Sequence, residues 1–73
     1  MQSFRFDLAA TLRRRRVLAM AANVFGSTEF ARSYLRTPNF ALGGATPSDL
    51  LSNAKGEQIV VSELQAQAGG GPV

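Results

Sequence analysis

The chain has 73 residues and a formal net charge of +3, and 45% of its residues are hydrophobic. A chain of this length supports one domain with a modest core, because it buries only about 60% of the surface that its unfolded form exposes. Cysteine and histidine are absent from the sequence, which excludes disulfide bridges, thiolate chemistry, the usual zinc sites and the commonest general base at neutral pH.

A first helix that ends at Phe25 is predicted from a set of apolar side chains, the last four of which follow the spacing of one buried stripe. The residues of this set are Leu8, Leu12, Val17, Ala21, Val24 and Phe25. Asp7 or Thr11 can cap the start of the helix. Gly26 is expected to end it, because glycine adopts the left-handed conformation found after many helices without a steric penalty.

A second helix is expected to begin after Ser27, whose hydroxyl can accept a hydrogen bond from a free amide, and Glu29 lies near the positive end of the helix dipole. The helix should stop at Thr37, because Pro38 disfavours helical geometry in the residue before it. Its apolar face consists of two pairs spaced four apart, with two arginines on another side. These residues are Phe30 with Tyr34, Ala31 with Leu35, and Arg32 with Arg36.

Residues 38–45 are predicted to form an ordered loop between the second and third helices. Asn39, Gly43 and Gly44 are residue types that favour turns. The apolar Phe40 and Leu42 are expected to anchor this loop to the core.

The clearest local signal is the start of a third helix at Thr46. Thr46 is a capping residue, Pro47 stands at the first helical position and Asp49 follows three positions after the cap. This short helix is expected to bury Leu50 and Leu51.

A last helix is predicted from Glu57 to residue 68, after a turn over residues 53–56 that contains asparagine and glycine. The run Ile59-Val60-Val61 would suit a strand equally well. An isolated strand, however, would have no second strand with which to pair.

Together these elements predict an all-α fold, a small bundle of about four short helices with an ordered Pro/Gly loop between the second and third. The helical domain is assigned to residues 11–68, with a partly disordered extension over residues 1–10 and a flexible tail over residues 69–73. The apolar run over residues 17–25 is about half the length that spans a bilayer, so no membrane contact is expected. The lack of disulfides favours a cytoplasmic location.

Positive charge is concentrated in the first half of the chain. Residues 1–36 contain seven arginines against Asp7 and Glu29, a net charge of +5, whereas the rest of the chain carries −2. Four of these arginines are consecutive: Arg13, Arg14, Arg15 and Arg16. They would fan through about 300° around a helix, because successive residues are about 100° apart. Two interpretations stay open, a solvated turn whose long stems cover apolar neighbours and electrostatic contact with phosphate or acidic protein.

Residues 22–35 invite a helix-turn-helix interpretation, since an alanine followed four positions later by a turn glycine is common in that motif. The motif also needs apolar residues just after the glycine and six residues after it. This chain has Ser27 and Arg32 there, so DNA recognition by these helices is disfavoured.

No catalytic site can be proposed from the sequence. Asp49 is explained by helix capping, Glu57 and Glu63 by solvent exposure, and Gly43-Gly44 is too short for a phosphate-binding loop. Because no nucleophile and base can be paired, the chain is predicted not to be an enzyme and to need no cofactor and no metal.

One ordered set of residues runs through the last two thirds of the chain. It consists of Phe25-Gly26, Ala31, Tyr34-Leu35, Pro38-Asn39-Phe40-Ala41-Leu42-Gly43-Gly44, Thr46-Pro47, Asp49-Leu50-Leu51, Gly56, Val60 and Leu64. In this order and spacing, the chain from Val24 onward resembles the C-terminal domain of the Xre/MbcA/ParS antitoxin family, the partners of RES-domain toxins that consume or transfer from NAD. Tyr34 departs from the family, whose members usually carry tryptophan there, and a helix-turn-helix domain commonly precedes the shared part.

The resemblance implies an antitoxin of a type II toxin–antitoxin system, which neutralises a RES-domain toxin by covering its NAD site with the last helix and the C-terminal tail. The complex is expected to hold two or more copies of each chain, and DNA binding would require a helix-turn-helix region outside this chain. The alternative function is a basic nucleic-acid-binding fragment that acts through Arg13 to Arg16.

The expected partner-binding residues lie in the last helix and the tail. They are Ile59, Val61, Glu63, Leu64, Gln65, Gln67, Ala68, Gly69, Gly70, Gly71, Pro72 and Val73. The apolar members exceed what so short a helix needs for its own core, which suits a partner interface. A glycine-rich tail could follow the floor of a cleft where bulky residues would not fit.

Overall fold

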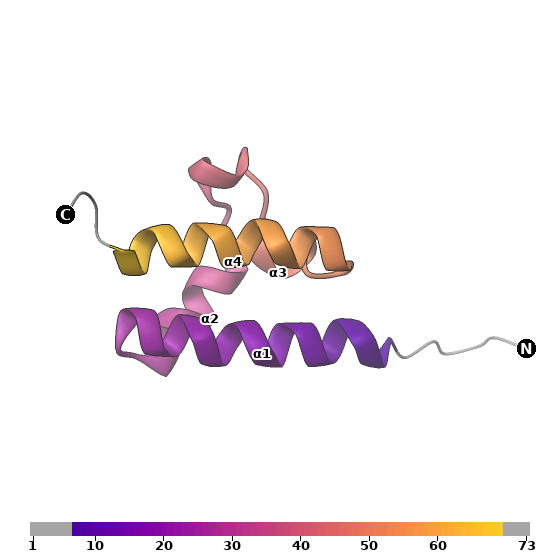
Figure 1. Ribbon diagram of the computed structural model, residues 1–73, viewed down its shortest axis with the longest axis horizontal. Coiled ribbons are helices and arrows are strands. Elements are labelled where there is room, and N and C mark those ends of the chain that lie inside the picture. Colours follow the sequence, from indigo (N-terminus) through magenta and orange to yellow (C-terminus); the bar gives the residue numbers. More distant parts are fainter. Residues whose placement is uncertain (1–6, 70–73) are drawn as a thin grey trace, which may run out of the picture.

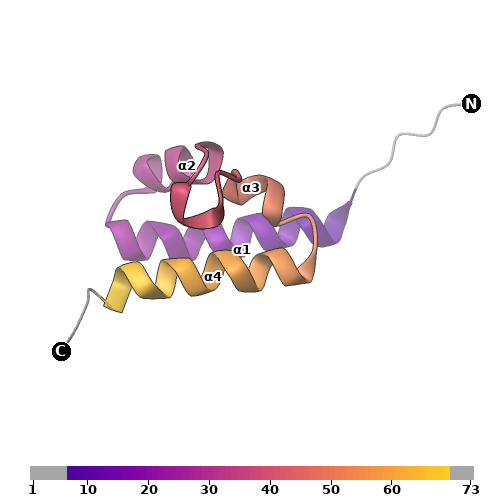
Figure 2. The same ribbon diagram turned by 90° about the horizontal axis from the view of Figure 1, so that it is seen from above.

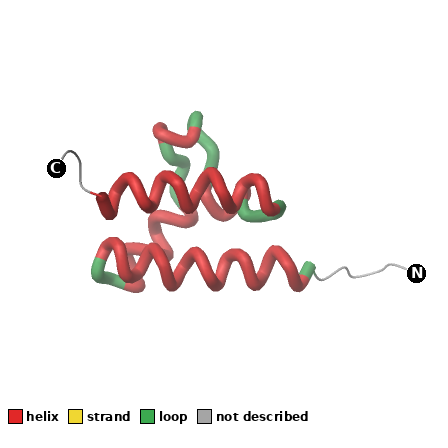
Figure 3. The backbone as a smooth tube through the Cα atoms, in the orientation of Figure 1, coloured by secondary structure: helices red, strands yellow, loops and turns green. Residues whose placement is uncertain are grey.

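The computed structural model describes residues 7–69, and every regular element among them is helical. Figure 1 shows α1 (Leu8–Phe25), α2 (Thr28–Arg36), α3 (Pro47–Leu50) and α4 (Ala54–Gly69), with a short 3₁₀ helix, η1 (Phe40–Leu42), between α2 and α3. Helices and loops account for the whole backbone of these residues (Figure 3). The all-α prediction with four helices is therefore confirmed.

The two long helices, α1 and α4, lie side by side and run in the same direction (Figure 1). The segment that contains α2, η1 and α3 returns the chain from the end of α1 to the start of α4. In this segment, α2 and α3 lie together on one side of the pair of long helices (Figure 2). In contrast, η1 lies on the α4 side of the molecule, away from α1 (Figure 1). This crossover leaves η1 in contact with α4.

The start of α1 and the turn into α2 follow the capping residues of the sequence. The Asp7 Oδ1 atom accepts a hydrogen bond of 3.1 Å from the Ala10 amide, and the Ser27 Oγ atom accepts one of 3.0 Å from the Phe30 amide. Gly26 has a φ of 73° and ends α1 in the left-handed conformation, as predicted. Because Asp7 provides the cap, the helix includes residues 8–10, which the sequence-based boundary had placed in the extension.

The predicted turn over residues 53–56 is wrong, because α4 already begins at Ala54. The Asn53 Oδ1 atom accepts a hydrogen bond of 2.8 Å from the Gly56 amide and so caps the helix. Gly56 is buried inside the first turn, where a Cβ atom would overlap the backbone carbonyl oxygen of Leu50. Glycine is therefore present here because α3 and α4 approach closely. Residues 59–61 lie inside α4, so they do not form a strand.

The core is a single cluster drawn from α1, α2 and α4, with one residue from the end of α3. Its buried members are Val17, Ala21, Ala31, Leu35, Leu51, Val60 and Leu64. Of the apolar set predicted on α1, Val17 and Ala21 are buried, whereas Leu8 and Leu12 are exposed. At 100° per residue, Leu8 and Leu12 lie about 180° and 140° from Val17 around the helix, so they do not share its buried face.

The two predicted loop anchors behave differently. Leu42 packs partly against the core, but the Phe40 side chain is 98% exposed, so the prediction that Phe40 anchors the loop is wrong. The short η1 turn presents Phe40 outward while Leu42 faces the core. Thr46 occupies the cap position of α3, yet its side chain accepts no capping hydrogen bond.

Among residues 7–69, no helix is long and apolar enough to cross a membrane. Gly69, predicted as the first residue of the tail, is the last residue of α4. The predictions for Gly70, Gly71, Pro72 and Val73 lie outside the described residues.

Candidate functional site

An open groove lies between η1 and α4 on the face that η1 occupies. Its volume is about 480 Å³, and it is lined by Ala41, Leu42, Gln58, Ile59, Ser62 and Glu63. Ala41, Leu42 and Ile59 contribute its apolar lining, and Gln58, Ser62 and Glu63 on α4 contribute amide, hydroxyl and carboxylate groups. We call this feature the η1–α4 groove.

The shape of η1 follows from the residues that bracket it. The Asn39 Oδ1 atom accepts a hydrogen bond of 2.8 Å from the Ala41 amide, and Gly43 and Gly44 both have positive φ. Backbone hydrogen bonds join Asn39 to Gly44 at 2.9 Å and to Ala45 at 3.0 Å. The loop is therefore closed at its base, and the exposed Phe40 stands beside the groove on a turn that is hydrogen-bonded to itself.

The predicted partner-binding residues of α4 do not share one face. Ile59, with 43% of its surface exposed, and Glu63 line the groove. Val61 packs partly against the core. Gln65, Gln67, Ala68 and Gly69 are exposed, but Gln65 lies about 120° from Ile59 around the helix at 100° per residue.

Leu64 cannot serve as a surface contact in this fold, because it is fully buried in the core. Its spacing of four residues from Val60 places both on the inner face of α4. The sequence pattern identified Leu64 as apolar and helical, and only the position of α1 and α2 shows which apolar residues of α4 are covered.

The partner-binding residues predicted from the sequence do not include η1 or the polar residues Gln58 and Ser62 of α4. Phe40, Ala41, Gln58 and Ser62 were not among the predicted contacts. The turn-forming residues around Phe40 were a signal that its side chain could be exposed. The presence of two apolar residues, Phe40 and Leu42, in the loop instead favoured the interpretation of an anchored loop.

Tyr34 lies under this region, with a hydroxyl that is buried and has no hydrogen-bond partner among the described residues. Burial raises the pKa of the Tyr34 phenol, and the negative charge of Glu63 acts in the same direction. The nearby Asn39 amide opposes this pKa shift, although its oxygen accepts from the Ala41 amide. The ring is held against Phe25 with centroids 5.2 Å apart.

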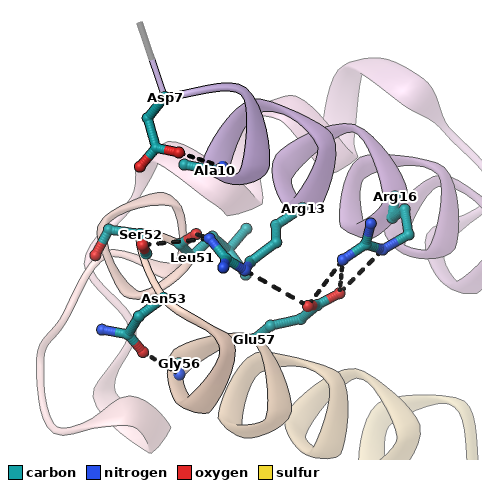
Figure 4. A network of polar contacts seen from close by, with 9 residues as sticks. All are labelled: Asp7, Ala10, Arg13, Arg16, Leu51, Ser52, Asn53, Gly56 and Glu57. Carbon is teal, nitrogen blue, oxygen red and sulfur yellow. Dashed lines mark hydrogen bonds and ion pairs between the residues drawn. The ribbon is translucent and has the colours of Figure 1, made fainter. Parts of the chain in front are cut away.

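Three of the four consecutive arginines bind other parts of the chain. Arg13 donates to the backbone carbonyls of Leu51 at 3.4 Å and Ser52 at 3.3 Å, and Arg16 pairs with Glu57 at 3.0 Å (Figure 4). On another side of α1, Arg14 donates to the Ser48 carbonyl at 3.1 Å. The fan around the helix is thus confirmed, and these side chains fasten α1 to α3 and α4.

No group of three or more acidic side chains within residues 7–69 is arranged to hold a metal ion. Glu63 accepts a hydrogen bond of 3.0 Å from the Gln67 side chain, and Asp49 stands in the first turn of α3. The arrangement at the η1–α4 groove is that of a binding surface with an apolar centre and a polar edge.

The comparisons with known proteins identify a family for most of the chain. The family model of the antitoxin Xre/MbcA/ParS C-terminal toxin-binding domain matches residues 20–70, which is 51 of the 73 residues. Searches of curated proteins and of solved structures gave no match. The matched region includes α2, η1, α3 and α4 together with the end of α1, so the chain belongs to the Xre/MbcA/ParS family of antitoxins through its toxin-binding domain.

Proposed function

We propose that this antitoxin domain binds a RES-domain toxin through the η1–α4 groove and covers the toxin's NAD site with the end of α4 and the tail that follows. Membership of a toxin-binding domain family supports a toxin partner. The RES type of the toxin, the NAD site, a cytoplasmic location and a complex with several copies of each chain are parts of the proposal. Binding, rather than catalysis, is the activity proposed for the domain.

The observation that carries this proposal is the exposure of Phe40 beside the groove. A phenylalanine side chain that moves from water into an apolar interface contributes about 1.5–3 kcal/mol, and aromatic residues are frequent among the residues that dominate binding energy. Phe40 is 98% exposed on a turn whose ends are hydrogen-bonded together. Because that turn is already formed, little ordering entropy would oppose its docking.

Ile59 extends this apolar surface from η1 onto α4. It lines the groove opposite Ala41 and Leu42, and Gln58, Ser62 and Glu63 supply hydrogen-bonding groups around it. An apolar centre with polar groups at its rim is the usual composition of a protein interface. The last turns of α4, from Gln65 to Gly69, are exposed and lead toward the tail that is proposed to enter the toxin's cleft.

The binding surface can be tested with two aspartate substitutions at residues of equal exposure. Ile59→Asp places a charge in the η1–α4 groove, whereas Leu12→Asp places one on α1, and the two side chains are 43% and 42% exposed. Affinity for the RES-domain toxin encoded by the neighbouring reading frame would be measured by calorimetry. We expect Ile59→Asp to weaken binding by about tenfold or more, the loss typical of an important interface residue, with little change for Leu12→Asp. Equal effects of both substitutions, or no effect of Ile59→Asp, would contradict the proposed surface.

The NAD-site part of the proposal requires a separate measurement. Deletion of residues 70–73 should leave toxin binding in place but abolish the rescue of growth and of cellular NAD when antitoxin and toxin are co-expressed. If the shortened chain still protects cellular NAD, the tail does not block the site. If the full chain binds the toxin without protecting NAD, the toxin's reaction is of another kind.

Within residues 7–69, the contacts of three of the consecutive arginines weigh against the alternative of nucleic-acid binding by all four together. Arg13 and Arg16 are engaged with α4 and with the end of α3, and Arg14 with α3. Three of the four arginine side chains therefore have partners within the protein, and these contacts do not require a phosphate group.

A further inference from the structure

A second groove lies between α1, α2 and α3, separate from the η1–α4 groove. Its volume is about 300 Å³, and its lining is formed by Thr11, Arg14, Arg15, Leu18, Arg32, Leu35, Arg36 and Ser48. Four arginines from two helices thus surround one depression, and its lining among the described residues includes no acidic side chain. We call it the arginine groove.

The helical spacing explains why only half of the consecutive arginines reach this groove. At 100° per residue, Arg14 and Leu18 lie about 40° apart on α1, whereas Arg16 lies about 160° from Arg14. The buried stripe of α1 therefore separates Arg13 and Arg16, which face α4, from the arginines of the groove. On α2, Arg32 and Arg36 are four residues apart and share one side of the helix.

The ion pairs found within residues 7–69 join Arg13 and Arg16 to Glu57 and include none of the arginines of the groove. Arg14 is held by a hydrogen bond of 3.1 Å to the Ser48 carbonyl, which carries no formal charge. Like charges gathered on one surface create a positive potential, which attracts an anionic partner and accelerates its association. Guanidinium groups are well suited to this task because their planar donors match carboxylate and phosphate oxygens.

The floor of the groove favours a protein over a nucleic acid. It is formed by Leu18 and Leu35, and Leu35 belongs to the hydrophobic core. A phosphate backbone would satisfy the arginines but leave this apolar floor uncovered. A peptide segment that carries an apolar side chain between acidic residues would satisfy both.

From this combination we propose that the arginine groove is a second docking site, which binds an acidic protein segment with a central apolar residue. None of its lining residues lies on η1 or α4, so its occupant does not compete for the surface proposed to bind the toxin. The match to the toxin-binding domain begins at residue 20, which leaves the α1 wall of the groove outside the matched region. The antitoxin could thus hold a toxin and an acidic partner at the same time.

The proposal is tested with the full chain and an acetylated peptide of sequence Asp-Glu-Leu-Glu-Asp. Two control peptides replace leucine by glycine, or all four acidic residues by their amides. The variant Arg15→Gln with Arg36→Gln removes one charge from each wall, and Arg16→Gln with Lys55→Gln removes the same charge outside the groove. Binding is followed by amide chemical shifts, which also report whether each variant is folded.

We expect the groove variant to weaken binding of the acidic peptide by about tenfold, as for the loss of charge-assisted hydrogen bonds, while the control variant changes it less than about twofold. Both control peptides should bind more weakly than the parent peptide, and the shifts should map to residues around Leu18 and Leu35. Equal weakening by both variants, or equal binding of the glycine peptide, would overturn the proposal. Tighter binding of a short DNA duplex at the same arginines would overturn it in favour of a phosphate site.

Discussion

At the scale of single residues, Tyr34 combines a well-packed ring with a poorly placed hydroxyl. The ring packs against Phe25, whereas the buried oxygen has no hydrogen-bond partner within residues 7–69. A buried polar group without a partner costs about 1–3 kcal/mol. We therefore expect Tyr34 to make the domain less stable than its aromatic packing would allow. Its hydroxyl lies close enough to Glu63, which lines the η1–α4 groove, for that charge to raise its pKa.

The raised pKa of Tyr34 predicts a loss of stability at alkaline pH. Burial and Glu63 raise the pKa above the ordinary value of 10.0, so the folded chain binds the phenol proton more tightly than the unfolded chain. This contribution to stability is fully present below pH 10 and is lost as the pH rises through the raised pKa. Because Tyr34 is the only tyrosine and the chain has no tryptophan, phenolate absorbance reports this titration directly.

The control for this titration is Tyr34→Phe, which keeps the ring and removes the ionisable group. We expect the variant to unfold in urea with a free energy about 1 kcal/mol higher at neutral pH and to lose less stability than the natural chain between pH 9 and 11. A phenol that titrates at its ordinary pKa, or a clearly destabilised variant, would contradict this description of the site.

Gly56 gives a second prediction at the residue scale. In an exposed helix, glycine to alanine adds about 1 kcal/mol of stability. At Gly56 the added Cβ would overlap the Leu50 carbonyl oxygen, and overpacking of this kind costs about 1–3 kcal/mol, so Gly56→Ala should destabilise the domain. Gly69→Ala, in the same helix with open space around it, should not, and urea denaturation of both variants measures the difference.

At the scale of elements, the two N-caps of α2 and α3 differ although both are hydroxyl residues. Ser27 accepts a hydrogen bond from the Phe30 amide, whereas the Thr46 side chain makes no capping hydrogen bond. The start of α3 is instead favoured by Pro47, because proline at the first helical position already has the φ angle of a helix. Two hydroxyl residues at the N-cap position, Ser27 and Thr46, therefore contribute differently to their helices.

This difference can be measured by matched alanine substitutions. Ser27→Ala should lower the free energy of unfolding by about 1 kcal/mol, the usual cost of losing an N-cap, and Thr46→Ala should lower it by less. Thermal unfolding followed by circular dichroism compares the two. A larger loss at Thr46 would indicate that its hydroxyl caps α3 in solution.

At the scale of the whole molecule, the basic segment of α1 holds the parallel helices together. Arg13 bridges α1 to the end of α3 and lies 3.9 Å from Glu57, and its side chain is 18% exposed. Arg16 reaches the same carboxylate from a side chain that is 59% exposed. One acidic residue on α4 therefore receives two arginines from α1, and Figure 4 shows the network beside the Asn53 cap.

We expect Arg13→Ala to destabilise the domain more than Arg16→Ala. An exposed ion pair contributes about 0–1 kcal/mol and weakens in salt, whereas removal of Arg13 leaves two backbone carbonyls without their donor. Urea denaturation at low and high salt would measure both, and the loss for Arg16→Ala should shrink in high salt. Equal losses at every salt concentration would mean that burial does not distinguish the two arginines.

Helix ends depend on local chemistry and could therefore be predicted from the sequence. The ends of α1 and α2 were predicted from Asp7, Gly26, Ser27 and Pro38, because caps and helix stops involve backbone groups within four residues of the side chain. The spacing of Val60 and Leu64 likewise indicated a helix, and the lack of a second strand to pair with decided against a strand over residues 59–61. The family resemblance from Val24 onward depended on the order of residues alone, and the family match confirmed it.

Which side chains are exposed, and which residues contact one another, was decided only by the tertiary structure. Phe40 and Leu64 are both apolar, and sequence spacing alone could not show that one is exposed and the other buried. Gly56 was mistaken for a turn residue because the Leu50 carbonyl that excludes a Cβ is defined only when α3 meets α4. Sequence by itself determined the presence of four helices, the cap at Ser27, the helix end at Gly26 and the family. The grooves and the role of each arginine were decided by the packing of α1, α2 and η1, since a surface forms only when segments distant in the chain are brought together.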